Sequence, residues 1–208
     1  MKTTILLIRH GQTEWNRVER FRGQADVELN STGEEQAEKT AEHISTHWKP
    51  VAVFSSPLRR AMKTAELIAL SCNVPVHQET RVIDINYGEW QGLTPEEVGE
   101  KWPALIRNWF DSPQDPFIPG GESLEEVKAR STTAVFSLVE KYPGNTVVLV
   151  GHTVVIRLIL LSVLGLQLDR FWIFRQDPCA INVLEVEGNE FTICLLNDTC
   201  HLEVKFFT

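Results

Sequence analysis

Six short apolar runs are spaced along the chain, and they predict six β-strands. Three of these runs are almost wholly apolar and rich in β-branched residues, which is typical of strands buried on both faces. The last two runs flank Glu187-Gly188-Asn189, a turn signal that predicts a hairpin. The predicted strands are Thr3–Ile8, Val51–Ser55, Val74–His77, Thr146–Val150, Ile181–Val186 and Glu190–Leu196.

Between these runs, apolar residues recur at helical spacing, and several stretches carry a capping signal. A Ser or Thr followed three residues later by Glu forms a capping box, which marks the first turn of a helix. Ser31, Thr94 and Ser123 each have such a Glu. The predicted helices begin near Ser31, Pro57, Thr94, Ser123 and Val154.

The alternation of strands and helices predicts an α/β fold. We expect a three-layer α/β/α sandwich with a mostly parallel sheet of about six strands, to which the C-terminal hairpin adds an antiparallel strand. The stretch 83–121 differs in character, because it holds three of the six Trp and five of the ten Pro residues. We expect one domain over residues 1–208, with a small cap insertion at about 83–121. Ligands of open α/β sheets bind beyond the carboxyl ends of the strands, where such a cap would cover them.

Charge and composition narrow the class of partner. The chain has 20 Lys and Arg against 28 Asp and Glu, a formal net charge of −8. A chain this acidic is poorly suited to nucleic acid or anionic membranes, so we expect neither as a partner.

No apolar run approaches the roughly 20 residues of a membrane span, and the first run is too short for a secretory signal. With four Cys residues and no Cys-x-x-Cys pair, we expect a cytoplasmic protein with reduced thiols.

Basic side chains follow three of the predicted strands. Arg9 and His10 end the first strand, His152 ends the fourth, and Arg59 lies just beyond the second. Singly, each is best interpreted as a hydrogen-bonded histidine or a surface ion-pair partner. Because the strand ends meet at one edge of a sheet, their convergence predicts a local anion pocket, and guanidinium groups suit phosphate oxygens.

Such a pocket would favour phosphoryl transfer. A histidine between arginines should have a lowered pKa, which leaves a neutral imidazole able to attack phosphorus. A nearby carboxyl would protonate the leaving group and then activate water, a scheme that needs no metal or other cofactor.

His43 and His47 stand four residues apart on a predicted helix, as zinc ligands can. The sequence offers no third ligand beside them, so we expect a solvated helix face and no metal site.

Six sequence segments resemble those of the histidine phosphatase superfamily, the group that contains the cofactor-dependent phosphoglycerate mutases. LLIRHGQTEWN resembles the family signature, and FRGQADVELNSTGEEQA the segment after it. SSPLRRAMKTAE, YGEWQG, PGGESLEEV and VGHTVVIR follow in the family's order. The resemblance implies that His10 is phosphorylated and that Arg9, Arg59 and His152 hold the phosphate. It also implies substrate-binding positions at Gly11, Thr13, Asn16, Gln24 and Thr153.

The proton donor is less clearly marked in the sequence. The family's acid is usually a Glu four residues before the Gly of the YGEWQG block. Counting back from Gly88 gives Asp84, a shorter carboxylate. Glu89 is the second candidate, although this position usually faces away in the family. We expect Asp84 to be the acid.

The chain length and the PGGESLEEV block are more similar to the phosphatase branch, which includes alpha-ribazole phosphatase, than to the mutases. Segment 83–121 contains only two cations, Lys101 and Arg107, so it offers little for a second phosphate. We therefore expect a metal-independent phosphomonoesterase that acts on a small phosphorylated metabolite. Alpha-ribazole phosphate is one candidate substrate. The alternatives are a 2,3-bisphosphoglycerate-dependent phosphoglycerate mutase and a catalytically silent phospholigand-binding protein. A homodimer formed through a helix end or the EVKFFT tail is a further hypothesis.

Overall fold

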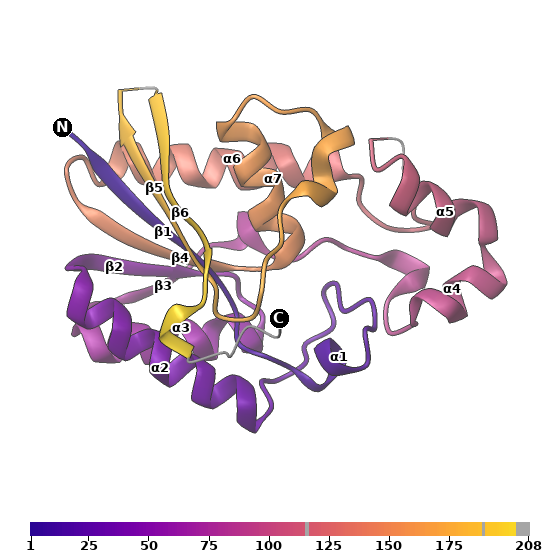
Figure 1. The fold of residues 1–208 in the computed structure, drawn as a ribbon, viewed down its shortest axis with the longest axis horizontal. Helices are drawn as coiled ribbons and strands as arrows, with labels where there is room; N and C mark the ends of the chain where they lie inside the picture. The colour runs from indigo at the N-terminus through magenta and orange to yellow at the C-terminus, as the bar shows by residue number, and fades with distance from the viewer. Residues whose placement is uncertain (115–116, 189, 203–208) are drawn as a thin grey trace.

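The six predicted strands form one sheet in the order β3-β2-β4-β1-β5-β6 (Figure 1). This computed structural model describes residues 1–114, 117–188 and 190–202. Pro116, Asn189 of the expected turn and the EVKFFT tail lie outside the described residues. Strands β1 to β4 pair in parallel, β5 runs antiparallel to β1, and β6 returns antiparallel to β5, as expected for a mostly parallel sheet with a C-terminal hairpin. The strands are β1 Thr3–Arg9, β2 Pro50–Ser55, β3 Val76–Gln78, β4 Thr146–Gly151, β5 Ile181–Glu187 and β6 Glu190–Asp198.

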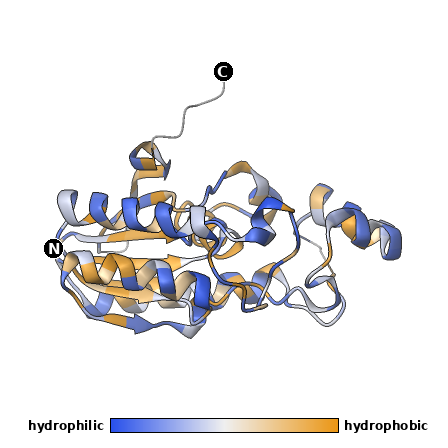
Figure 2. Cartoon of the chain, turned by 90° about the horizontal axis from the view of Figure 1, so that it is seen from below, coloured by the Kyte–Doolittle hydropathy of each residue, from blue (hydrophilic) through white to orange (hydrophobic). Residues whose placement is uncertain are grey.

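Helices cover both faces of the sheet, which confirms the three layers. Successive side chains of a strand point to opposite faces, so Ile5 and Leu7 of β1 join the core beneath α6 and α7. Leu6 and Ile8 join the core beneath α2 and α3. Figure 2 shows the apolar strands of the sheet beside helices that carry both polar and apolar residues. The α-helices are α1 Glu14–Arg17, α2 Ser31–His47, α3 Arg59–Cys72, α4 Pro95–Lys101, α5 Pro103–Asp111, α6 Leu124–Lys141 and α7 Thr153–Val163.

Two helix starts agree with the predicted caps and two differ. Thr94 and Ser123 form capping boxes at α4 and α6. At α2 the cap is Asn30 rather than Ser31, because the Asn30 side chain accepts the Gly33 N–H and Ser31 is already helical. Helix α3 begins at Arg59 instead of Pro57.

The segment after β3 leaves the sheet and carries α4 and α5, which lie at the right end of the molecule in Figure 1. Short 3₁₀ helices, Thr80–Val82 and Gly88–Trp90, lead into this segment. Trp90 and Trp109 are buried there and pack edge to face, with ring centroids 6.2 Å apart. Two further 3₁₀ helices follow α7 and β6, at Leu168–Ile173 and Cys200–Leu202.

Within the described ranges, none of the helices combines the length and apolarity required to cross a membrane.

Candidate active site

His10 follows the last residue of β1 and is buried. Its Nδ1 lies 2.7 Å from the Gly11 carbonyl oxygen, which can only accept, so Nδ1 carries the ring proton. The other nitrogen, Nε2, therefore holds the lone pair. Burial, reinforced by the charges of Arg60, Arg9 and Arg22, holds the pKa of His10 well below its usual value. His10 is thus a neutral imidazole with Nε2 free to act as a nucleophile.

His152 faces His10 from the end of β4. The two rings have centroids 5.2 Å apart. The Nε2 of His152 is 2.7 Å from the Ser56 hydroxyl, and its Nδ1 is 3.6 Å from Asp84 Oδ2. Burial first, and then the Arg60 charge, lowers the pKa of His152. The predicted meeting of the two histidines at the carboxyl ends of β1 and β4 is present in the structure.

The structure brings Arg60, not Arg59, to this site. The Arg59 side chain is 61% exposed and pairs with Glu28 at the surface, whereas Arg60 is fully buried and lies 3.1 Å from Asp84 Oδ2. Adjacent residues on a helix point about 100° apart, so only one of the two can face inward. The expectation for Arg59 is corrected accordingly, and Arg60 takes its place.

Arg22 is a second cation that the sequence interpretation missed. It is partly buried, and it lines the same cavity as Arg9. The Nε atoms of Arg9, Arg22 and Arg60, and Nδ1 of His152, are buried without a hydrogen-bond partner. Unpaired buried polar atoms are costly, so four of them together indicate a site built for an oxyanion. Arg22 lies in an irregular segment and does not follow a strand. The strand pattern that predicted the site therefore gives no indication that Arg22 reaches it.

Asp84 supplies the carboxyl group of the site. Burial outweighs the attraction of Arg60 and Arg22 and raises the pKa of Asp84, which favours the protonated form. Its Oδ1 accepts the Ile85 N–H at 3.0 Å. Glu89, the alternative acid, is exposed and does not line the cavity. The structure thus places Asp84 at the site and Glu89 outside it.

The expected substrate-binding residues divide into two groups. Asn16 and Thr153 line the cavity. Thr13 is buried as the N-cap of α1 and bonds to Asn16, while Gln24 donates to the Asp84 carbonyl at 3.1 Å. Gly11 supplies the carbonyl that orients His10. Thr13, Gln24 and Gly11 therefore do not line the cavity themselves but make contacts that position neighbouring residues.

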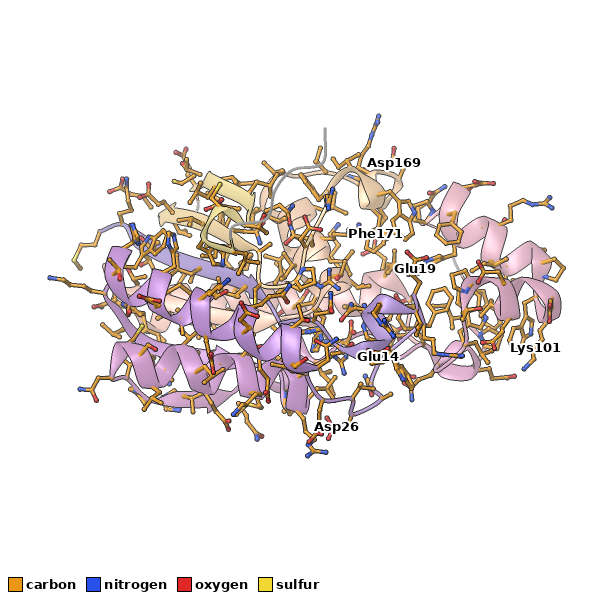
Figure 3. All side chains as sticks on the ribbon, turned by 60° about the horizontal axis from the view of Figure 1, so that its bottom comes forward. Glu14, Glu19, Asp26, Lys101, Asp169 and Phe171 are labelled. Carbon is orange, nitrogen blue, oxygen red and sulfur yellow. The ribbon has the colours of Figure 1, made fainter. Side chains whose placement is uncertain are left out.

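The cavity of about 350 Å³ extends from Arg9, Arg22 and Asp84 towards α5. Trp109 and Phe110 of α5 pack against Phe171 and Trp172, and the four residues together form an aromatic wall of the cavity. Figure 3 shows Glu19 and Phe171 between the sheet-bearing part of the molecule and α4 and α5. Further cations line it from outside segment 83–121, namely Arg20 and Arg157, whereas Lys101 and Arg107 do not.

A neutral buried imidazole, unpaired guanidinium donors and a carboxyl with a raised pKa define an enzyme of the phosphoryl-transfer class. The arginines can neutralise the equatorial oxygens of a phosphoryl group, which is the main requirement of that chemistry. The imidazole can accept the group, and the carboxyl can exchange protons with the alcohol and with water.

Comparison with known proteins gives this class its family. The sequence profile of the histidine phosphatase superfamily (branch 1) matches residues 5–199. The chain belongs to this family and is a histidine phosphatase. It is 38% identical to phosphoserine phosphatase 1 of Hydrogenobacter thermophilus over 198 residues, which cover 95% of this chain and 93% of that protein. It is 35% identical to the metal-independent phosphoserine phosphatase of Arabidopsis thaliana, over 96% of this chain and 83% of that one.

The fold agrees with this assignment. The solved structure of YhfR from Bacillus stearothermophilus superposes with a TM-score of 0.92 at 28% identity. The match covers 96% of this chain and 99% of that structure. The α/β architecture predicted from the sequence is therefore that of the histidine phosphatases.

Proposed function

We propose that this chain is a metal-independent phosphomonoesterase that works through a phosphohistidine at His10 and acts on phosphoserine. The observation that carries the mechanism is the set of three buried, unpartnered guanidinium N–H donors, on Arg9, Arg22 and Arg60, beside a histidine whose Nε2 holds a lone pair. A phosphoryl group would satisfy those donors while its phosphorus meets Nε2.

In the first step, Nε2 of His10 forms a bond to phosphorus as the P–O bond of the ester breaks in line. Arg9, Arg22 and Arg60 neutralise the phosphoryl oxygens. The proton of Asp84 passes to the departing alkoxide, so the alcohol leaves neutral and Asp84 becomes a carboxylate. The raised pKa of Asp84 in the free enzyme supports this role.

In the second step, the Asp84 carboxylate takes a proton from water, and the water oxygen bonds to phosphorus as the N–P bond breaks. Inorganic phosphate leaves, and Asp84 and the neutral His10 are restored. Residues 83–121, as a cap, limit the access of bulk water, because Trp109 and Phe110 from α5 close one wall of the cavity.

The substrate proposal rests on the charges beyond the phosphate and on the relatives that are phosphoserine phosphatases. The Nε of Arg157 donates to the Phe174 carbonyl, and its guanidinium lies over the Phe171 and Trp172 rings at 5.3 and 4.9 Å. Its remaining N–H groups can bind the carboxylate of phosphoserine. Glu19, on the same cavity, is the partner for the ammonium group.

A second candidate substrate follows from the aromatic wall. Trp109, Phe110, Phe171 and Trp172 offer stacking surfaces to a ring-bearing alcohol such as the one released from alpha-ribazole phosphate. The opposite charges of Glu19 and Arg157, both on the cavity lining, favour a zwitterionic substrate instead, so phosphoserine is the leading proposal.

The test is a comparison of kcat/KM for four substrates in the presence of EDTA: phosphoserine, phosphoethanolamine, 3-phosphoglycerate and alpha-ribazole phosphate. Phosphoserine should be best, and phosphoethanolamine, which lacks the carboxylate, should be about 10- to 100-fold worse. Arg157→Met should raise KM for phosphoserine and leave phosphoethanolamine unchanged.

Three results would contradict the proposal. A higher kcat/KM for alpha-ribazole phosphate than for phosphoserine would show that the aromatic residues of the cavity bind the ring of that substrate. Interconversion of 2- and 3-phosphoglycerate faster than phosphate release would identify a mutase. Activity lost in EDTA and restored by a divalent cation would show that the reaction needs a metal.

A further inference from the structure

Three potential metal ligands from distant parts of the chain meet away from the active site. They are His43 on α2, Asp198 at the end of β6 and His201 on the 3₁₀ helix Cys200–Leu202. One ligand atom from each lies within 4.8 Å of the other two. The sequence interpretation rejected His43 and His47 as a zinc pair for want of a third ligand, and the fold brings two from the end of the chain.

A hydrogen bond made by Nε2 of His201 leaves the lone pair of the other ring nitrogen, Nδ1, free to bind a metal ion. The Thr40 hydroxyl donates its single proton to the Gln36 carbonyl at 2.7 Å, and its oxygen lies 2.9 Å from Nε2 of His201. Nε2 must therefore be the donor to Thr40, so the lone pair of the neutral ring is on Nδ1. That Nδ1 is buried and has no hydrogen-bond partner. Metal-binding histidines are usually oriented in this way, by donating their other N–H to a neighbouring oxygen.

The other two ligands are also available. Asp198 uses Oδ1 to accept the Cys200 N–H at 3.0 Å, and its carboxylate also accepts a hydrogen bond from the Cys200 thiol, a weak donor that a metal ion can displace. The His43 ring is stacked on that of His201, with centroids 5.1 Å apart. Ligand atoms on a tetrahedral Zn²⁺ lie about 3.4 Å apart, so modest side-chain rotations would bring the three atoms from their present spacing onto one ion.

We propose that His43, Asp198 and His201 form a binding site for a divalent transition metal, of which Zn²⁺ is the best match. Two neutral imidazoles and a carboxylate are ligands that Zn²⁺ accepts in proteins, and Mg²⁺ and Ca²⁺ prefer all-oxygen sites. His47, whose Nδ1–H donates to the His43 carbonyl at 2.9 Å, holds its lone pair on Nε2 beside the site. A bound ion would tie the C-terminal end of the sheet to α2 and stabilise the fold without entering catalysis.

The test is a Zn²⁺ titration of untagged, EDTA-stripped protein against a chromogenic chelator. We expect one Zn²⁺ per chain, and at least about a 100-fold weaker affinity in His43→Ala and in His201→Ala. The matched control is His77→Ala, an exposed histidine on β3 at the opposite edge of the sheet, which should bind as the parent does. Equal loss in the His77 variant, or parent affinity in the His43 and His201 variants, would overturn the proposal.

Two further variants separate this site from the active site and from a folding defect. Thr40→Val keeps all three ligands and the side-chain volume but removes the acceptor for His201, so affinity should fall about 10-fold, and Thr40→Ser should restore it. His10→Ala should still bind one Zn²⁺. The ligand variants should keep their phosphatase activity, and Zn²⁺ should raise the melting temperature of the parent but not of His201→Ala. Binding that is lost in His10→Ala would place the ion among the catalytic residues and refute the proposal.

Discussion

One backbone carbonyl decides which nitrogen of His10 can react. The Gly11 oxygen holds the proton on Nδ1 and so leaves the lone pair on Nε2. Gly11 also lies so close to α2 that an added Cβ would stand 2.4 Å from the Gly33 oxygen. The residue that orients the nucleophile is therefore glycine because no side chain fits between the catalytic strand and the start of α2.

The neighbouring residues Arg59 and Arg60 provide a matched pair for testing the oxyanion site. Arg60→Lys keeps the charge but loses the planar fork, so kcat/KM for a phosphomonoester should fall about 10²- to 10³-fold. Arg59→Lys changes an exposed ion pair and should leave kcat/KM close to that of the parent. Steady-state kinetics of the two variants, with thermal unfolding to check the fold, make the measurement. A larger loss in the Arg59 variant would restore the interpretation made from the sequence.

Asp84→Asn tests the acid. The variant cannot protonate an alkoxide, so kcat for phosphoserine should fall about 10²- to 10⁴-fold. p-Nitrophenolate leaves without a proton, so the first step should stay fast with p-nitrophenyl phosphate while hydrolysis of the phosphoenzyme slows. Stopped-flow absorbance should then show a burst of one p-nitrophenolate per chain. Glu89→Gln is the control and should behave as the parent; inactivity of that variant with an active Asp84→Asn would reverse the assignment.

The elements themselves were largely predictable from local sequence. All six strands appear within a few residues of the apolar runs, and the capping boxes at Thr94 and Ser123 form as predicted. These features depend on side chains a few positions apart. Local sequence could not tell which of Arg59 and Arg60 reaches the active site, because this depends on the residue at which α3 begins. Likewise, the nearness of His201 to His43 arises only when the sheet and α2 pack together.

The capping box of α6 gives a prediction at the scale of a single element. The Ser123 hydroxyl accepts the Glu126 N–H at 3.2 Å and donates to the Glu126 carboxylate at 2.8 Å. Ser123→Ala removes both bonds and should lower the free energy of unfolding by about 1 kcal/mol. Ser45→Ala, an exposed serine within α2, should change it by less than about 0.5 kcal/mol. Urea denaturation of both variants makes the comparison, and equal effects would show that the cap contributes nothing particular.

The molecule as a whole carries a net charge of −8, yet the positive charges of Arg9, Arg22 and Arg60 act on two buried histidines, His10 and His152. That arrangement favours anion binding at the expense of stability in acid. Burial and the arginine charges lower the pKa of both His10 and His152 in the folded state. The pKa of a histidine in the unfolded chain is about 6.5. Below that pH the two histidines become protonated in the unfolded chain but stay neutral in the folded protein. The free energy of unfolding must therefore fall as pH falls below that value, and this contribution is constant above it.

The corresponding prediction concerns His10→Asn. Between pH 8 and pH 5 the parent should lose more stability than the variant, and the difference should grow below about pH 6.5 by at most about 1.4 kcal/mol per pH unit. Asp84 acts with the opposite sign, since its pKa is raised, but it is present in both proteins and cancels in the comparison. Urea unfolding at successive pH values gives the two profiles. His77→Asn is the exposed control, and parallel profiles for parent and His10→Asn would contradict the account.

The central claim, that His10 carries the phosphoryl group, has a direct measurement. Asp84→Asn enzyme mixed with p-nitrophenyl phosphate is quenched in alkali, where phosphohistidine survives, digested, and analysed by mass spectrometry. One phosphoryl group is expected on His10, acid-labile and absent when His10 is also replaced by Asn. A phosphoryl group on any other residue, or turnover at the parent rate by the single variant His10→Asn, would contradict it.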